Sequence, residues 1–491
     1  MRGISEDVKT ATFAFFIFTT CLLAYLSNRD VLVGGDAVSN VHLAVRFART
    51  GELTLTPLKE PFLFSWRWTI PRTGNPYIRL KSEDEFGTRV RYVLLDAQHS
   101  EVAGVPYYLI ATKQAAEYGS TFGPGSALAA APFFAIAHLF MNDLEGRPAW
   151  LWYGAKVIAS LFVAASAVFV FLSCLNFFSK GQSALVGLAY GLGTSVWSVS
   201  SQILWQQTPS LFFLSLGMYL LSALNPSGLR LALGGMAFGS AFAVRPLDGL
   251  FGAVFFMFCL ITRRRRAWFY VLGSLVPILY LLFYNFRSFG QIFSFGQLEI
   301  GKAVALGKTG SSDVWQTPLW EGLSGLLFSP GRGLFLFTPT ACFGFWGLWR
   351  SLRVQSNSFF KASSVGVVLM LILAAKWFDW WGGWTYSYRP ILAGMPFLAV
   401  LAGSTLSALN SKFLLRMLGV LFFTWSIYTQ ILGAFAYNLS DWNAKNGQDI
   451  DNPLYRGRLW SLMDSPILFY TKNFTHSRES KKQEIQNWLN N

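Results

Sequence analysis

The stretch VLVGGDAVSNVHLAV, Val31 to Val45, organises the rest of this chain, because it follows directly on the first hydrophobic segment, Thr12 to Leu26. That segment is apolar enough to enter a bilayer. Two glycines, Gly34-Gly35, then turn the chain, and Asp36 appears where the segment should leave the membrane. A carboxylate at that depth is costly to desolvate, which predicts a functional role. The alternative is a helix-capping aspartate at the membrane surface, with Ala37 opening the helix.

The composition predicts an all-α polytopic membrane protein. Of the 491 residues, 53% are hydrophobic and only 13% are charged, whereas soluble domains carry roughly 25% charged residues. The net charge of +15 is better explained by basic cytoplasmic loops than by binding of nucleic acid, because no basic soluble domain is visible. The four cysteines all lie in apolar runs, so neither a disulfide framework nor a metal set is expected.

Apolar runs predict about eleven transmembrane helices, within a range of ten to thirteen. After the first span, ten further spans are expected: Trp150–Phe178, Ser183–Val199, Thr208–Leu224, Leu231–Val244, Gly249–Ile261, Trp268–Tyr284, Gly333–Trp349, Phe359–Ala375, Ile391–Leu409 and Phe413–Tyr437.

The expected organisation has four parts: the first helix (residues 1–27), an external loop with juxtamembrane helices (28–149), the multi-span bundle (150–437) and an external tail (438–491). The run Arg263 to Arg266 is the strongest basic loop and marks the cytoplasmic side. Counting back places the amino terminus in the cytoplasm and the carboxyl terminus outside, provided that Gly123–Phe140 is a juxtamembrane or re-entrant helix. Val41–Leu53 is expected to be a helix along the interface. A bacterial inner membrane is the expected location.

Three arginines at the predicted outer ends of spans are candidates for phosphate binding: Arg245, Arg389 and Arg332. The planar guanidinium suits phosphate and stays charged when partly buried. The alternative for each is snorkelling to lipid headgroups.

The most aromatic run in the chain is Lys376 to Tyr386, KWFDWWGGWTY. Clustered tryptophans at a membrane boundary form an interfacial belt in most proteins. Stacking faces with sparse polar groups also suit a saccharide or prenyl chain. On the second interpretation the sugar or lipid surface is formed by Trp381, Trp384, Tyr386 and Asp379.

Metal and cofactor chemistry has little support in the sequence. The four histidines show no ligand spacing, and no carboxylate pair forms a DxD motif. No Walker loop, nucleophile elbow or Rossmann glycine pattern is present. We therefore expect no cofactor, and a divalent metal is unsupported.

Four segments resemble the GT-C membrane glycosyltransferases, which include the protein O-mannosyltransferases and the aminoarabinose transferases that modify lipid A. They are GGDAVSNVHLAVRFARTGEL (Gly34–Leu53), EYGSTFGPGSALAAAPF (Glu117–Phe133), SPGRGLFLFTP (Ser329–Pro339) and WWGGWTYSYRPILAGMPFL (Trp380–Leu398). The likeness is architectural over nearly the whole chain, and its local motifs are loose.

This resemblance implies transfer of a sugar from a polyprenyl-phosphate donor to a glycan, lipid or protein acceptor at the outer face, with inversion. It implies Asp36 as the base and Glu117 as a second acidic site, the latter on a poor local match. Arg389 and Arg245, with Arg332 behind them, are the implied phosphate ligands. The chain lacks the paired Asp-Glu of the mannosyltransferases, so the resemblance implies neither a metal requirement nor a particular acceptor class.

Other functions remain open at this point. A lipid or polysaccharide transporter or flippase also needs many spans and intramembrane charge, although repeated halves are not visible in the sequence. An O-antigen-ligase-like transferase would use a large late loop, and the loop Asn285–Arg332 is shorter than the first. A non-catalytic membrane scaffold would tolerate replacement of Asp36.

Overall fold

The computed structural model describes residues 2–56, 63, 78–83, 90–95, 101–102, 107–114, 117–141, 143–354, 357–409 and 413–490. Most of these residues are helical. The α-helices are α1 (Arg2–Leu26), α2 (Gly35–Thr50), α4 (Gly125–His138), α5 (Pro148–Cys174), α6 (Lys180–Gly193), α7 (Gln207–Ser222), α8 (Gly228–Val244), α9 (Gly249–Arg263), α10 (Ala267–Phe289), α11 (Gly296–Thr309), α12 (Leu319–Phe328), α13 (Leu334–Phe337), α14 (Ala341–Arg353), α15 (Ser358–Lys376), α16 (Met395–Leu409), α17 (Phe413–Phe435), α18 (Pro466–Lys472) and α19 (Phe474–Asn490).

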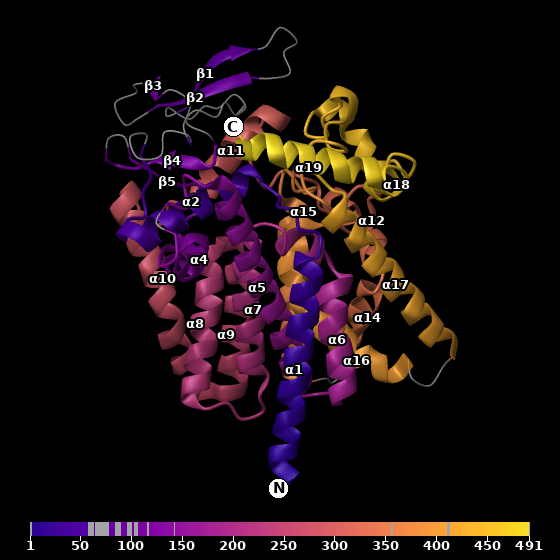
Figure 1. Cartoon of the computed structure of the whole chain (residues 1–491). Coiled ribbons are helices and arrows are strands. Elements are labelled where there is room, and N and C mark those ends of the chain that lie inside the picture. Colours follow the sequence, from indigo (N-terminus) through magenta and orange to yellow (C-terminus); the bar gives the residue numbers. More distant parts are fainter. Residues whose placement is uncertain are drawn as a thin grey trace.

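The long helices run side by side, with the N terminus at one end of the bundle and the C terminus at the other (Figure 1). We call the end that carries α2, β4, β5 and the C-terminal tail the loop face, and the opposite end the N-terminal face. The basic turn Arg264–Arg266 joins α9 to α10. Because α9 leads away from the loop face, this turn lies at the N-terminal face, as the alternation of basic loops predicts. Which face meets the cytoplasm stays a prediction.

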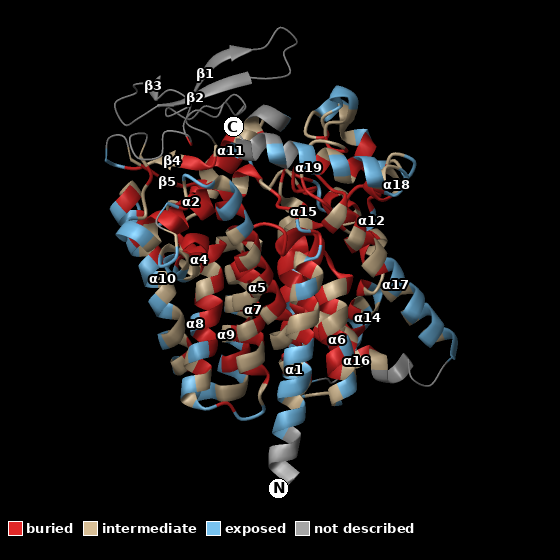
Figure 2. Cartoon of the chain, in the orientation of Figure 1, coloured by how far each residue is buried: buried red, intermediate tan, exposed pale blue. Residues whose placement is uncertain are grey.

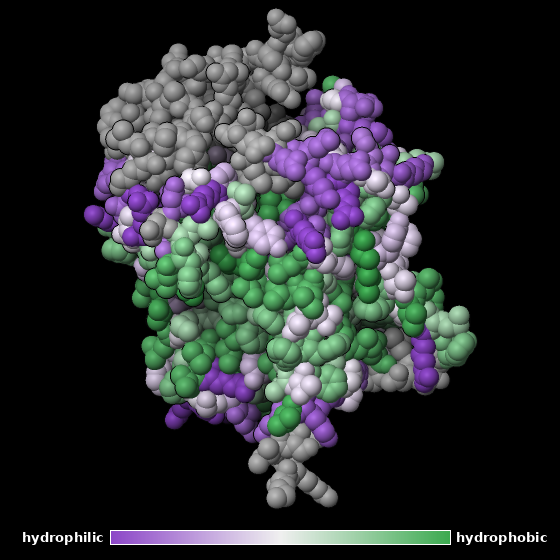
Figure 3. Space-filling view, viewed as in Figure 1, coloured by the Kyte–Doolittle hydropathy of each residue, from purple (hydrophilic) through white to green (hydrophobic). Residues whose placement is uncertain are grey.

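Helix length and composition make this an integral membrane protein. Among the described residues, six helical stretches are long and apolar enough to span a bilayer: Asp7–Leu26, Pro148–Cys174, Pro246–Phe289, Ser358–Lys376, Arg389–Leu406 and Phe413–Phe435. A hydrophobic belt surrounds the middle of the visible surface, with hydrophilic surface at both ends (Figure 3). Each expected span contains a helix, but the count of about eleven is not confirmed.

Two expected spans are interrupted. Gly333–Trp349 is divided into α13 and α14 by residues 338–340, where Pro339 lacks the N–H that a continuous helix needs. In Ser183–Val199, α6 ends at Gly193 and a five-residue π-helix, Val196–Ser200, follows. The sequence signal failed here because hydropathy does not register such breaks.

The mostly helical structure agrees with the expected all-α membrane protein, and short strands occur only as additions in the first loop of the described chain. Strands β1 (Ile78–Glu83), β2 (Val90–Leu95) and β3 (Glu101–Val102) form an antiparallel sheet in the order β1-β2-β3. Strands β4 (Leu109–Ala111) and β5 (Tyr118–Ser120) form a second antiparallel pair. Short β-branched and aromatic stretches made these strands difficult to separate from loop by pattern alone.

Helix α2 differs from the interfacial helix expected over Val41–Leu53. It begins earlier, at Gly35, and ends at Thr50, because Gly51 adopts a left-handed φ of 72° as the C-cap. All but one of the residues from Gly35 to Arg46 are buried, and α4 packs against the helix. The capping alternative for Asp36 is also wrong, since Gly34 is the N-cap and Asp36 lies in the first helical turn.

Glycines allow α8 and α10 to pack with their backbones in contact. A Cβ at Gly273 would lie 1.8 Å from the carbonyl oxygen of Ala232, and one at Gly235 would lie 2.0 Å from that of Tyr270. Small residues serve membrane helices in this way, because lipid supplies no hydrophobic force between them. The interior of the bundle is buried, while α1 and α17 each have an exposed half (Figure 2).

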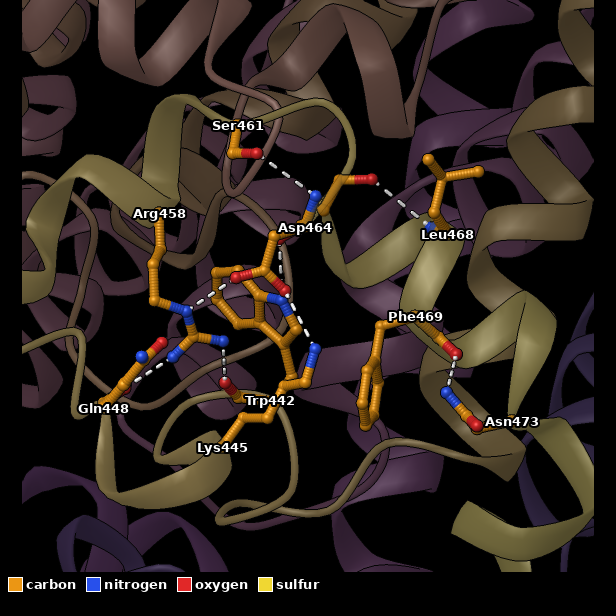
Figure 4. A network of polar contacts seen from close by, with 10 residues as sticks. Trp442, Lys445, Gln448, Arg458, Ser461, Asp464, Leu468, Phe469 and Asn473 are labelled. Carbon is orange, nitrogen blue, oxygen red and sulfur yellow. Dashed lines mark hydrogen bonds and ion pairs between the residues drawn. The ribbon is translucent and has the colours of Figure 1, made fainter.

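The C-terminal tail folds as an ordered unit on the loop face. Arg458 donates from Nε to Asp464 Oδ2 at 2.7 Å and from Nη2 to the Trp442 carbonyl at 2.7 Å (Figure 4). The indole of Trp442 donates to the carbonyl of Asp464. One of the contacts between the tail and the bundle is at the carbonyl of Ala434, which accepts from Asn28 just after α1 and from Lys481 in α19.

Candidate functional site

Asp36 and Arg389, 353 positions apart in the chain, form an ion pair at the loop face. Arg389 Nη1 donates to Asp36 Oδ2 at 2.7 Å. Asp36 is held in the first turn of α2, where the helix dipole favours negative charge. Arg389 opens the 3₁₀ segment Arg389–Gly394 that leads into α16. The side chains keep 27% and 17% of their surface exposed, respectively, so the pair can meet a ligand. The structure thus brings together two residues that the sequence named separately.

Tyr107, which the sequence did not single out, completes the surroundings of the carboxylate. Its hydroxyl donates to Asp36 Oδ1 at 2.6 Å. Burial, and then the adjacent charge of Asp36, raise the pKa of Tyr107 well above its ordinary value, so the phenol remains a donor at neutral pH. A Cβ at Gly35 would lie 2.5 Å from the Tyr107 hydroxyl, so the second glycine of the turn leaves the space that this contact needs.

The guanidinium of Arg389 is held on three sides. Besides Asp36, it donates from Nη2 to the carbonyl of Gly382 at 2.8 Å, and it lies 4.6 Å from the ring centre of Trp205. Three of its five N–H groups have no hydrogen bond to a described residue. The buried indole N–H of Trp205 also has no partner among the described residues. The unused N–H groups of Arg389, whose side chain is partly exposed, can donate to the oxygen atoms of an anionic ligand.

Arg245 contacts the residue that follows Arg389 in the chain. It donates from Nη1 to Asp248 Oδ1 at 3.1 Å and from Nη2 to the carbonyl of Pro390 at 3.4 Å. The second oxygen of Asp248 accepts from Ser210 at 2.6 Å. Because Arg245 is buried and its charge is balanced by Asp248, we interpret its contact with Pro390 as fixing the backbone next to Arg389.

Arg332 is fully buried and engaged elsewhere. It donates to the carbonyls of Gly331, Trp381 and Gly383 and to the side chain of Asn443 at 2.8 Å. Burial lowers its pKa to about 10, which leaves it charged at neutral pH. Its donors therefore join the aromatic loop to the tail and are not presented to a ligand.

The predicted aromatic surface is divided between core and tail. Tyr386 is buried and donates to the carbonyl of Thr429 at 2.8 Å. The indoles of Trp381 and Trp384 donate to tail carboxylates, those of Asp451 and Asp449 respectively, at 2.9 and 2.8 Å.

Asp379 accepts from the backbone N–H of Gly383 at 3.0 Å and so shapes the turn. Both Gly382 and Gly383 adopt positive φ there. The aromatic run is thus mostly a folded loop whose Gly382 carbonyl reaches Arg389. Its partly exposed members are Lys376, Trp377, Asp379 and Trp384.

Glu117 makes its contacts with residues other than Asp36 and Arg389. Its backbone pairs with that of Thr112 at 2.9 Å, next to β5, and its carboxylate lies about hydrogen-bonding distance from the Gln114 amide, 2.9–3.0 Å. Within the described ranges, the hydrogen bonds and ion pairs of Asp36 and Arg389 do not involve the Glu117 side chain. Among those same residues, no group of three or more His, Cys, Asp or Glu side chains is arranged to hold a metal ion.

Comparisons with known proteins give distant structural neighbours. No protein-family model matches the chain, and no curated protein matches it in sequence. The crystal structure of ArnT from Cupriavidus metallidurans bound to undecaprenyl phosphate is 13% identical with a TM-score of 0.44, covering 88% of this chain and 70% of that chain. The apo ArnT structure is 14% identical with a TM-score of 0.42, covering 100% and 74%. ArnT is a lipid A aminoarabinose transferase, one of the enzymes that the sequence resembles, and no residue role is transferred from it.

Proposed function

We propose that the protein is a membrane glycosyltransferase that moves a sugar from a polyprenyl-phosphate donor to an acceptor at the loop face, with inversion. The observation that carries the proposal is the partly exposed Asp36–Arg389 pair. It places a proton acceptor beside a cation with unused donors, at the boundary of a bundle whose donor substrate would lie in the bilayer.

Each side chain has a distinct role in this reaction. The acceptor hydroxyl attacks the anomeric carbon, the bond from that carbon to the phosphate oxygen breaks, and the hydroxyl proton passes to Asp36. General-base catalysis of this kind contributes roughly 10²–10⁴-fold. Polyprenyl phosphate leaves as an anion, and the remaining N–H groups of Arg389 stabilise its developing charge.

The supporting residues set the geometry. Tyr107 orients the carboxylate through Oδ1, which leaves lone pairs on both oxygens for the acceptor proton. Arg245 and Gly382 hold the backbone and guanidinium of the 389 segment. Glu117 and Arg332 have no part in the proposed chemistry, because their contacts are made elsewhere.

The test is release of sugar from a radiolabelled polyprenyl-phosphate donor by the purified full chain, comparing the parent with Asp36→Asn. The substitution keeps size and removes charge. We expect turnover by the parent and a loss of at least about 100-fold in the variant, with donor binding retained. A matched control is Asp313→Asn, an exposed aspartate in the loop before α12, which should turn over as the parent does.

Two results would contradict the proposal. Equal turnover by the parent and Asp36→Asn would remove Asp36 from the reaction. No turnover by the parent with several donors, together with movement of the labelled lipid across a vesicle bilayer, would favour a lipid transporter.

A further inference from the structure

A cavity lies between helices of the bundle, and neither Asp36 nor Arg389 lines it. It has a volume of about 490 Å³ and is bounded by α6, α14, α16 and α17. The residues of α17 that line it, from Leu415 to Phe423, belong to the first half of that helix. The other end of α17 reaches the loop face at Ala434, so the cavity lies toward the N-terminal face.

The cavity borders a buried pair of hydroxyl groups. Its lining includes Thr338, whose hydroxyl lies 2.5 Å from that of Tyr388. Tyr388 also accepts from the backbone N–H of Ser195 at 3.0 Å and is fully buried. Neither Asp36 nor Arg389 lines the cavity, so we treat it as a space apart from the candidate active site.

The cavity reaches the outer surface of the bundle along α17. Its lining is mainly aliphatic and aromatic, and one lining side chain of that helix, Val420, is 67% exposed. Apolar surface of this kind, within the hydrophobic belt, faces hydrocarbon. The occupant therefore enters from the bilayer as a hydrocarbon chain.

The volume suits a hydrocarbon chain. A dry cavity of about 150 Å³ holds a benzene molecule, and this one, at about 490 Å³, is roughly three times as large.

Charge at the cavity's outer end selects the headgroup. Arg416 lines the cavity and is exposed, and Lys180 lies between the lining residues Ser179 and Gly181. The four surrounding helices contain no aspartate or glutamate, but they carry basic residues, namely Lys180, Arg350, Arg353 and Arg416. Basic residues near a membrane surface attract anionic lipids.

We propose that this cavity is a binding site for an anionic phospholipid of the leaflet at the N-terminal face. One acyl chain occupies the cavity, and the phosphate lies at Arg416. This lipid site is distinct from that of the sugar carrier. The proposal requires that the bundle spans a bilayer, and it does not require the transferase reaction.

Native mass spectrometry of the delipidated full chain tests the proposal, with dioleoyl-phosphatidylglycerol and dioleoyl-phosphatidylcholine as probes. We expect one retained phosphatidylglycerol per chain and weaker retention of phosphatidylcholine. Arg416→Gln should weaken phosphatidylglycerol binding about fivefold, because one basic residue at such a surface contributes about that factor, and should leave phosphatidylcholine unchanged.

A variant that fills the cavity with a large side chain gives a more decisive test. Gly419 lines it, and a Cβ there meets only Phe343 at 3.9 Å, so Gly419→Trp should place an indole in the cavity and abolish retention of the lipid. Leu421→Trp, on the same helix but outside the lining, is the matched control and should bind as the parent does. Ala402→Phe fills the cavity from α16 and replaces Gly419→Trp if that variant does not fold.

Three results would overturn the proposal: no lipid retained by the parent, equal retention by both cavity-filling variants, or stoichiometric displacement of phosphatidylglycerol by undecaprenyl phosphate. The last would make the cavity part of the carrier site. Because the readout is lipid binding, an inactive transferase that still retains phosphatidylglycerol would contradict the proposed function alone.

Discussion

Replacing Arg389 by glutamine should weaken binding of the carrier phosphate. The guanidinium makes three contacts: 2.7 Å to Asp36, 2.8 Å to the Gly382 carbonyl, and 4.6 Å to the ring centre of Trp205. Glutamine keeps a neutral amide group with two N–H donors and loses the charge, the planar fork and the contact with Trp205. If the phosphate binds the remaining N–H groups, its affinity must fall.

The size of the loss follows from the contacts. A hydrogen bond to a charged group contributes about 1.5–3 kcal/mol, which corresponds to about 10–150-fold in Kd. One lost phosphate contact therefore predicts at least about tenfold weaker binding. Arg389→Lys keeps the charge without the planar fork and should fall between the parent and Arg389→Gln.

The assay is equilibrium binding of undecaprenyl phosphate to the purified full chain in lipid nanodiscs, followed by turnover of the same samples. Arg287→Gln, an exposed arginine in the last turn of α10, is the matched control and should bind within about twofold of the parent, as surface charges contribute little. The fold-loss of turnover in the double variant Asp36→Asn/Arg389→Gln should be smaller than the product of the two single fold-losses. The reason is that the effects of residues in direct contact are not additive.

An unchanged Kd for Arg389→Gln would refute this reasoning, and the phosphate site would then lie elsewhere on the loop face. Loss of binding in Arg287→Gln as well would show that general surface charge, and not the Arg389 fork, holds the carrier.

Three further predictions concern residues that support the site and the tail. Gly35→Ala should displace the Tyr107 hydroxyl, because the added Cβ would lie 2.5 Å from it. Turnover should then fall about tenfold, the value of one charge-assisted hydrogen bond, and Tyr107→Phe should show the same loss. A normal rate for Gly35→Ala would disprove this prediction. Arg458→Ala removes the bonds to Asp464 and Trp442 and should destabilise the tail by about 2–3 kcal/mol, seen as faster hydrogen exchange there and not in α5; unchanged exchange would contradict it. Burial lowers the pKa of Lys481 to about 8 from its ordinary 10.5. Between these two pH values the unfolded chain binds more protons than the folded chain, so the stability of the folded state rises with pH. Protection of α19 from proteolysis should therefore increase over this pH range in the parent and stay constant in Lys481→Met, and a decrease in the parent would contradict the prediction.

Part of the site was predictable because its members carry strong local cues. Asp36 follows two glycines at the end of an apolar helix, and Arg389 precedes Pro390 at the start of another, so both stand out as charges where desolvation is costly. Arg332 carries the same cue and serves a different purpose. Its position beside a span end did not reveal that Trp381, Gly383 and Asn443 would enclose it.

Other contacts had no sequence cue. Tyr107 lies in a long polar loop, and a tyrosine there has many possible partners, so only the fold brings it to Asp36. The tryptophans at 381 and 384 matched an interfacial belt or a saccharide surface equally well. Their indoles instead donate to aspartates about 65–70 positions later in the chain, and such pairings depend on how the tail folds back.

The sequence by itself determined that the chain is a bundle of apolar helices, roughly where each helix lies, and that a few charges would stand at its boundary. Those properties follow from hydropathy and from the length of helix that crosses a bilayer, which are local. Only the tertiary structure decided that Asp36 meets Arg389, that Arg245 and Arg332 act as supports, that the first loop holds strands, and that neither Asp36 nor Arg389 lines the inner cavity. These depend on contacts between segments up to 353 positions apart, which packing selects and local pattern does not encode.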